Sequence, residues 1–155
     1  MHAKKTLPQL EIGSLPPQYL GKDSDGNKLN LEEMKGKIVI ITFWASWCPP
    51  CIKELPYLER IQDKLGTKNI QTIAINYKES RKHYRRIKKR FSDSTLILAH
   101  DQKGILAKKF GVDKLPNLFL IDKEGRLAYH GVGYKEESLV KIIDVINKQL
   151  AKPDS

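Results

Sequence analysis

Two runs rich in β-branched and aromatic residues, 37–44 and 69–77, dominate the hydrophobic pattern of the chain. Short apolar runs bounded by turn residues are typical of strands buried inside a sheet. Between them, apolar residues recur at helical spacing over 50–65, and Gly66 is a suitable stop. The apolar stripe of this helix consists of Leu55, Leu58, Ile61 and Leu65. Pro56 lies inside the helix and should bend it. The pattern predicts a strand–helix–strand unit.

Along the rest of the chain, segments with the hydrophobic pattern of strands alternate with segments that have helical spacing. Asp25-Gly26 is a strong turn signal between Tyr19-Leu20 and 28–31, which predicts a hairpin, and Gly36 closes a short helical turn after it. Further helices are predicted over 79–91, 103–112 and 136–150, and strands over 95–100, 115–122 and 127–133. In the last helix the expected inward side chains are Leu139, Ile142, Ile143, Ile146 and Leu150. The predicted fold class is α/β, with a mixed central sheet, helices on both faces and an N-terminal β-hairpin extension.

The 155 residues have the length of one ordinary domain, which we place at 15–150 between an N-terminal tail, 1–14, and a C-terminal tail, 151–155. A domain of this size with 40% hydrophobic residues can build a sufficient core without a disulfide. No segment reaches the about 18 consecutive apolar residues that a membrane helix requires. The first residues also lack the apolar run of an intact signal peptide. We therefore expect either a cytosolic protein or a chain from which a leader or anchor has been removed.

Charge adds one feature to this outline. The formal net charge is +10, and eight of the thirteen residues from Lys78 to Arg90 are Lys or Arg. Tyr84, Ile87 and Phe91 recur at helical spacing in this stretch, which leaves the basic residues to a solvated face. The alternative is a surface that docks an acidic partner, with Arg85 and Arg86 as the residues to test. No nucleic-acid-binding motif accompanies the run, so we expect no nucleic-acid partner.

Both cysteines of the chain lie in the stretch WASWCPPC, as Cys48 and Cys51. A structural bridge would close too short a loop to constrain the unfolded chain much. A zinc site would need two further ligands, and the histidines occur singly along the chain. These single histidines are His2, His83, His100 and His130. The pattern therefore favours a redox-active pair over a staple, and we expect no metal ligands.

A redox dithiol needs a thiolate near neutral pH, although a free cysteine titrates near about 8.5. A helix N-terminus stabilises a thiolate through unpaired N–H groups and partial positive charge, and Cys48 lies at such a strand-to-helix junction. We expect Pro49 outside the helix, Pro50 as its first residue and Cys51 inside it as the resolving thiol. The two prolines remove N–H donors near the sulfurs. We hypothesise that this weakens thiolate stabilisation, so Pro49→Gly should lower the pKa of the Cys48 thiol.

Glu54 is the candidate proton acceptor for Cys51. It falls in line with Leu58 and Ile61 on the helical wheel and is the only charged residue inside that apolar stripe. Burial there would raise its pKa toward the working range of a base. The alternative is that the bend at Pro56 turns Glu54 outward, where it would only complement the helix dipole. The wheel alone leaves both interpretations open.

Other residues near the pair have more than one interpretation. Trp47, beside Cys48, is either rim packing or a partner contact, and Trp44 is expected in the core. The Leu115-Pro116 bond at a strand start is either trans or cis. Gly131 and Gly133 indicate a bulge or a close approach in the last strand. The histidines at 83, 100 and 130 are expected at the surface or in polar networks rather than as ligands.

The motifs resemble those of the thioredoxin superfamily. The residues that carry this resemblance are FWASWCPPC, then Pro56, then FGVDKLPNLFLIDKEG, then GVG. The hairpin with DGNKLNLEEMKGK and the CIKELP that follows the cysteines resemble the TlpA/ResA-like group of bacterial extracytoplasmic thioredoxins. The resemblance covers roughly residues 15–150. It implies a thioredoxin-like fold with an N-terminal hairpin.

The resemblance also assigns roles to particular residues. It implies an active-site acid at Glu54, because the buried aspartate of ordinary thioredoxins, two residues before Trp44, is Thr42 here. It further implies a cis peptide at Leu115-Pro116, whose backbone faces the sulfurs and pairs with a substrate segment. The expected substrate-binding residues are Trp47, Pro49, Pro50, Leu115 and Pro116.

The expected function is thiol–disulfide exchange between Cys48/Cys51 and cysteine pairs of target proteins, as a reductant of the cytochrome c maturation type. No cofactor is expected beyond the redox-active disulfide. The expected state is a monomer in the periplasm or another extracytoplasmic space, with a membrane electron donor as a further candidate partner. Two alternatives remain, a copper- or haem-handling binding protein on the same fold and a tryparedoxin-like reductase partner, whose WCPPC motif is shared. The direction of electron flow depends on a reduction potential that no sequence pattern gives.

Overall fold

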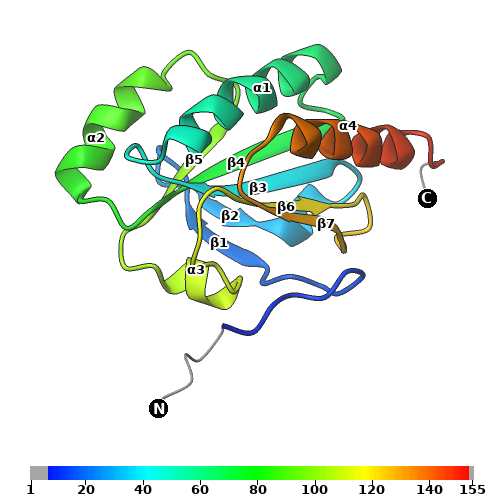
Figure 1. Ribbon diagram of the computed structural model, residues 1–155, viewed down its shortest axis with the longest axis horizontal. Helices are drawn as coiled ribbons and strands as arrows, with labels where there is room; N and C mark the ends of the chain where they lie inside the picture. Colours follow the sequence, from blue (N-terminus) through cyan, green and yellow to red (C-terminus); the bar gives the residue numbers. More distant parts are fainter. Residues whose placement is uncertain (1–6, 154–155) are drawn as a thin grey trace.

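The computed structural model describes residues 7–153, and its centre is a five-stranded mixed sheet (Figure 1). In spatial order the strands are β5 (Ile97–Asp101), β4 (Ile70–Tyr77), β3 (Ile38–Trp44), β6 (Asn117–Ile121) and β7 (Leu127–Val132). β3, β4 and β5 run parallel, whereas β6 is antiparallel to β3 and β7 is antiparallel to β6. The predicted α/β class with a mixed sheet is confirmed.

Helices cover both faces of this sheet (Figure 1). One face carries α1 (Pro49–Leu65), α2 (Arg81–Arg90) and α4 (Glu136–Leu150). The other carries α3 (Ile105–Lys109) and the N-terminal hairpin of β1 (Tyr19–Lys22) and β2 (Lys28–Asn30), with the short 3-10 helix η1 (Leu31–Met34) after it. The predicted hairpin extension is therefore present. It covers one face of the core, and Asp23, directly after β1, forms an isolated bridge to Ala99 of the edge strand β5.

The central strand β3 decides which side chains meet at the site. All seven of its residues are buried, as its unbroken apolar run predicts. Successive side chains of a strand point to opposite faces. Ile38 and Ile40 accordingly pack with α1 and α4, while Ile41 and Phe43 pack with the hairpin and α3. Thr42 is the one polar residue of the strand, and its side chain reaches the α1 side.

Two local predictions are wrong. Pro49 does not lie outside α1 but is its first residue, with Cys48 as the N-cap in an extended conformation. The fixed φ of proline already suits the first helical position, so two successive prolines fit at the first and second positions. Ile143 is 39% exposed rather than inward, because the buried stripe of α4 is narrow and follows Ile142, Ile146 and Gln149.

Residues 9–14, which the sequence assigns to the N-terminal tail, lie against the domain. Gly13 N–H donates to the Leu127 carbonyl at 2.7 Å, and Leu127 N–H donates back to the Ser14 carbonyl at 2.9 Å. The Gln9 amide donates to the Gly111 carbonyl at 3.0 Å. Gly111 has a φ of +70°, and a Cβ there would lie 2.3 Å from the Pro8 carbonyl oxygen. The division into domain and tails stays a prediction.

We expect Gly111→Ala to destabilise the protein, because the new methyl group meets both a left-handed backbone and the Pro8 carbonyl. Gly26→Ala is the matched control, since Gly26 has a φ of +84° but open space around its Cβ position. The control should lower the free energy of unfolding by about 1–2 kcal/mol, the cost of the backbone alone. Gly111→Ala should lower it by roughly 1 kcal/mol more in urea unfolding. Equal losses in both variants would contradict the close contact.

Candidate active site

Cys48 and Cys51 form a disulfide at the N-terminus of α1. Cys48 is the helix N-cap, and its sulfur accepts the Cys51 backbone N–H at 3.4 Å. Cys48 is 5% exposed and Cys51 is fully buried. The first N–H groups of a helix have no partner within the helix and carry partial positive charge. A thiolate on Cys48 would therefore be stabilised, and it is also the more accessible of the two sulfurs.

The two prolines limit how many N–H groups reach this sulfur. An N-cap side chain accepts from the second or third helical residue. Pro50 occupies the second position and has no N–H, while Cys51 occupies the third and does donate. Pro50, rather than Pro49, is therefore the proline whose missing donor faces the sulfur. Both proline rings are exposed beside the disulfide.

Glu54 lies inside the protein, so the outward-facing alternative is wrong. It is 2% exposed, and the Thr42 hydroxyl of β3 donates to its Oε1 at 2.9 Å. Burial raises the pKa of Glu54 to about 7, against a smaller lowering by the Thr42 hydrogen bond. Glu54 is also three residues beyond Cys51 on the same helix, a spacing that places two side chains on one face. A carboxyl with this pKa can both accept and release a proton near neutral pH.

The loop before β6 contributes to the surroundings of the disulfide. The Leu115–Pro116 peptide bond is cis, and the Pro116 side chain is buried. Leu115 packs against the buried cluster that includes Cys48 and Cys51. The Pro116 carbonyl accepts the Gly133 N–H at 2.8 Å, which ties this loop to the segment after β7. The structure thus places Leu115 against the cluster that contains the cysteines, and Pro116 is buried directly after it.

The two tryptophans of the motif have separate environments. Trp44 is buried at the end of β3 and contacts Phe91, with their ring centroids 5.4 Å apart. Trp47 is 66% exposed directly before Cys48. Such a large exposed aromatic surface beside a reactive sulfur is available to a partner protein.

Comparisons with known proteins agree with this geometry. The Redoxin family model matches residues 3–146. The chain belongs to the Redoxin family. It is 36% identical over 119 residues to the thiol-disulfide oxidoreductase ResA of Bacillus thuringiensis subsp. konkukian, covering 77% of this chain and 68% of that protein. It is 29% identical to ResA of Bacillus subtilis, covering 83% of this chain and 71% of the relative.

Solved structures of similar shape point the same way. A Chlorobium tepidum protein provisionally named thiol:disulfide interchange protein DsbE has a TM-score of 0.81 and 27% identity, covering 92% of this chain and 100% of its own. StoA from Bacillus subtilis has a TM-score of 0.65 and 26% identity, covering 83% and 96% respectively. With the Cys48–Cys51 disulfide, these matches identify this Redoxin-family chain as a thiol–disulfide oxidoreductase of the TlpA/ResA-like group. The predicted resemblance is confirmed.

A polar network that the sequence did not indicate fixes the loop before Cys48 in this Redoxin-family protein. Glu79 is buried, and its carboxylate accepts the Ser46 N–H at 3.1 Å, the Ser46 hydroxyl, and the Asn76 amide at 2.5 Å. His83 Nε2 lies 3.5 Å from Glu79 Oε1 and 2.8 Å from Ser46 Oγ. Both contacts use the same ring nitrogen, so the group is not a Ser-His-acid triad. No local pattern reveals it, because Ser46 and Glu79 are far apart in sequence.

Tyr129 of β7 lies within electrostatic range of Glu54. Burial, and secondarily the charge of Glu54, raise the pKa of Tyr129. A Cβ on Gly131 would lie 2.8 Å from the Tyr129 hydroxyl, so this glycine makes room for the ring. The close approach expected at Gly131 is confirmed. His130, on the same strand, contacts the Asn117 side chain at 2.7 Å and stacks on Phe119, as expected for a polar-network histidine.

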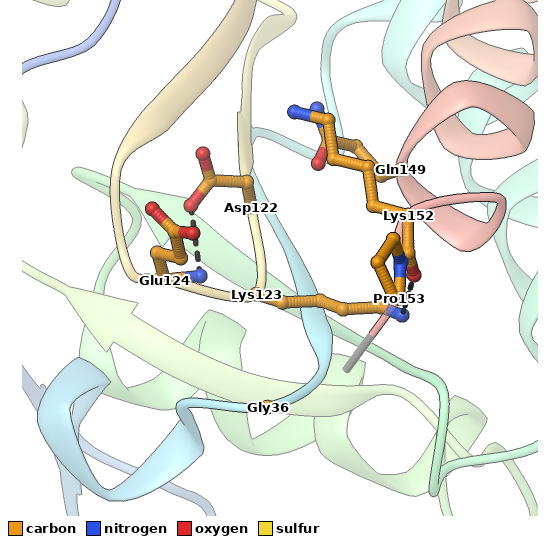
Figure 2. Close-up of a pocket in the computed structure, with 7 residues that line it drawn as sticks. All are labelled: Gly36, Asp122, Lys123, Glu124, Gln149, Lys152 and Pro153. Atoms are coloured by element: carbon orange, nitrogen blue, oxygen red, sulfur yellow. Dashed lines mark hydrogen bonds between the residues drawn. The ribbon is translucent and has the colours of Figure 1, made fainter. Parts of the chain in front are cut away.

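A hollow of about 300 Å³ between Asp122 and Lys152 lies away from the disulfide (Figure 2). It is next to the end of β6 that pairs with the start of β3, while the cysteines follow the end of β3. Asp122 Oδ1 accepts the Glu124 N–H at 2.9 Å in the β6–β7 turn. This carboxylate therefore has a structural role in the turn. Among residues 7–153, no group of three or more His, Cys, Asp or Glu side chains is placed to hold a metal ion.

Within the described part of the chain, no helix is both long and apolar enough to cross a membrane.

We expect Pro50→Ala to make the Cys48 thiol of the reduced protein more acidic, because it restores an N–H donor at the second helical position. The alkylation rate at pH 6 should rise about two- to fivefold. Pro49→Ala is the matched control and should change this rate less, since the first helical N–H does not face the N-cap side chain. A larger effect from Pro49→Ala, or none from Pro50→Ala, would contradict this assignment.

Because Glu54 is buried with a raised pKa, we expect the stability of the protein to depend on pH. An ordinary glutamate has a pKa of 4.5, and the raised value of about 7 means that the folded protein binds more protons between these two pH values. The free energy of unfolding of the oxidised protein should therefore fall as pH rises through this window, by up to about 3 kcal/mol. Glu54→Gln should flatten the fall in urea titrations at several pH values. Glu59→Gln, the same change on the same helix, should keep it, and a persistent slope in Glu54→Gln would refute the assignment.

Proposed function

We propose that this protein reduces disulfide bonds of target proteins, with Cys48 as the attacking thiolate and Cys51 as the resolving thiol. The observation that carries this proposal is the disulfide at a helix N-terminus with a buried, proton-exchanging carboxyl one turn further along the helix. The more accessible sulfur is the one that accepts a backbone N–H, which supports its role as nucleophile. The fully buried sulfur is protected from outside disulfides and can attack only the mixed disulfide.

The first half of the reaction forms a mixed disulfide. The Cys48 thiolate attacks one sulfur of the target disulfide, and a bond forms between that sulfur and Cys48 Sγ. The other target sulfur leaves as a thiolate and takes a proton from solvent. The helix N-terminus favours the attack because it stabilises the thiolate form of Cys48.

The second half releases the target. The Cys51 thiol transfers its proton to the Glu54 carboxylate and attacks Cys48 Sγ, which forms the intramolecular disulfide. The second target sulfur leaves as a thiolate and is protonated in turn. The two electrons that the target gains come from the Cys48/Cys51 pair. Its first proton comes from solvent, and its second replaces the Cys51 proton, which Glu54 releases as it returns to the carboxylate. An electron donor outside this chain, for which we propose a membrane protein, then reduces the disulfide again.

The target segment would lie across the exposed surface around Cys48. Trp47 and the rings of Pro49 and Pro50 offer apolar contact area on one side of the sulfur. The Leu115–Pro116 backbone would pair with the target segment, as the resemblance to the thioredoxin superfamily implies. The cis bond and the packing of Leu115 against the cluster that contains the cysteines support this. These five residues are the proposed substrate-binding set.

The proposed setting is extracytoplasmic, with a reducing role of the cytochrome c maturation type. The support is the resemblance to the TlpA/ResA-like group, whose members are mostly reductants outside the cytoplasm. Direction follows from the reduction potential of the Cys48/Cys51 pair against its compartment, so that potential is the deciding measurement.

The test is to trap the target. Cys51→Ser should stop the reaction at the mixed disulfide and capture a target protein through Cys48 from a cell-envelope fraction. Cys48→Ser is the matched control and should capture none. A Cys51→Ser variant that captures no protein under these conditions would refute the proposal. The reduction potential of the unaltered protein, measured against glutathione, then shows whether the captured target is reduced or oxidised.

A further inference from the structure

A groove of about 630 Å³ runs along one flank of α1, directly beside the disulfide loop. Pro49 and Pro50 form its end nearest to the cysteines, and Tyr134 and Lys135, from the segment before α4, form its opposite wall. Because Pro49 and Pro50 belong to both the groove and the Cys48–Cys51 loop, a protein whose disulfide reaches Cys48 comes next to this groove.

Three cations line this groove against one carboxylate. Lys53, Arg60 and Lys135 are exposed there, together with Glu136. No ion pair within residues 7–153 engages any of the three cations. Lys53 and Arg60 lie seven residues apart, which places them on one face of α1. The groove therefore offers unpaired positive charge beside the reactive sulfur.

Aromatic rings join the two walls of the groove and order one of its three cations, Arg60. The Tyr57 and Tyr134 rings stack with centroids 6.1 Å apart, which joins the two walls of the groove. The Arg60 guanidinium lies 5.1 Å from the Tyr57 ring centroid. Stacking on a ring orders a guanidinium while its N–H groups stay free at the edges for carboxylates. The Gly133 N–H bond to the Pro116 carbonyl also ties the Tyr134 wall to the loop beside the sulfurs.

The other flank of α1 has the opposite balance. The groove between α1 and α2 is lined by Ile52, Phe91 and other apolar side chains, and its charges are Arg90 against Glu59 and Asp93. The two flanks of the same helix therefore differ in sign close to the disulfide. A ligand with negative charge would distinguish them.

We propose that the groove between Pro49, Arg60 and Lys135 binds an acidic segment of the substrate protein that flanks its reactive disulfide. This inference rests on the proposed reduction of target disulfides and adds the class of substrate. Exposed charges at the edge of an interface act mainly on the association rate and lose their effect at high salt. The groove thus selects among disulfides by the charge around them.

The test uses two synthetic peptides with the same intramolecular disulfide. One carries Glu-Glu-Asp next to the cysteines and the other carries Gln-Gln-Asn there. The reduced protein should reduce the acidic peptide about tenfold faster at low ionic strength, a ratio that three exposed ion pairs can supply. The ratio should approach one at high salt. Equal rates for both peptides at low salt would overturn the proposal.

Two variants locate the selectivity. Lys53→Gln/Arg60→Gln/Lys135→Gln and the control Arg85→Gln/Arg86→Gln/Lys89→Gln each remove three cations, which lowers the formal net charge from +10 to +7. The groove variant should lose most of the tenfold ratio, and the α2 variant should keep it. Loss of the ratio in the α2 variant instead would show that the basic helix binds the acidic segment. A changed sedimentation coefficient of the groove variant would show that a second copy of the chain occupies the groove. Either result overturns the proposal.

A small uncharged disulfide distinguishes failure of the proposed function from failure of the acidic-segment site. If the unaltered protein reduces neither peptide nor bis(2-hydroxyethyl) disulfide, the proposed function fails. If it reduces bis(2-hydroxyethyl) disulfide but treats the two peptides alike, the proposed function stands and the acidic-segment site is wrong.

Discussion

The hydrogen bond from the Cys51 N–H to the Cys48 sulfur is the interaction on which the rest of the site depends. It exists because β3 ends at Trp44 and α1 begins at Pro49, which leaves Cys48 as the helix N-cap. Serine or aspartate usually fills this position, and here the Cys48 sulfur receives the one N–H that the two prolines leave near it, that of Cys51. The surroundings hold this junction in place. Buried Glu79 fixes Ser46 two residues upstream, and Leu115 packs against the buried cluster that contains both cysteines.

The packing of α1 on β3 also explains how the core accommodates the carboxyl group of Glu54. Glu54 is on the inward face of α1, opposite Thr42, which the strand alternation of β3 also directs inward. One hydroxyl donor compensates only part of the cost of burying a carboxylate, and the pKa of about 7 reflects the uncompensated part. The cost of burial and the capacity to exchange a proton near neutral pH have the same physical origin. A second donor to Glu54 would stabilise the charged form and weaken it as a base.

The elements with unbroken apolar runs were predictable from the sequence, and so was the cysteine pair. β3 and β4 begin and end within one residue of their predicted bounds, since burial on both faces leaves a strong local pattern. The start of α1 was misplaced by one residue, because a rule about the residue before a proline competes with the preference of proline for the first helical turn. The burial of Ile143 was predicted wrongly because a helical wheel shows which way a helix face points. It does not show how wide a surface that face packs against. Glu79 was missed because its partner in the loop before Cys48, Ser46, is distant in sequence, and its contacts with nearby Asn76 and His83 follow no recognised local pattern.

The positive charge that stands out in the sequence is not the positive charge that lies beside the disulfide in the folded protein. The basic run of α2 is the most visible charged feature of the sequence, yet consecutive cations on a helix spread around its exposed side. The groove beside the disulfide draws its cations from α1 and from the segment before α4, where no run of basic residues occurs. A net charge of +10 attracts any acidic molecule over a distance of about 10 Å at moderate salt. Only cations grouped next to the reactive sulfur can distinguish disulfides by the charges beside them, because the field of the whole molecule responds mainly to the net charge of an approaching protein.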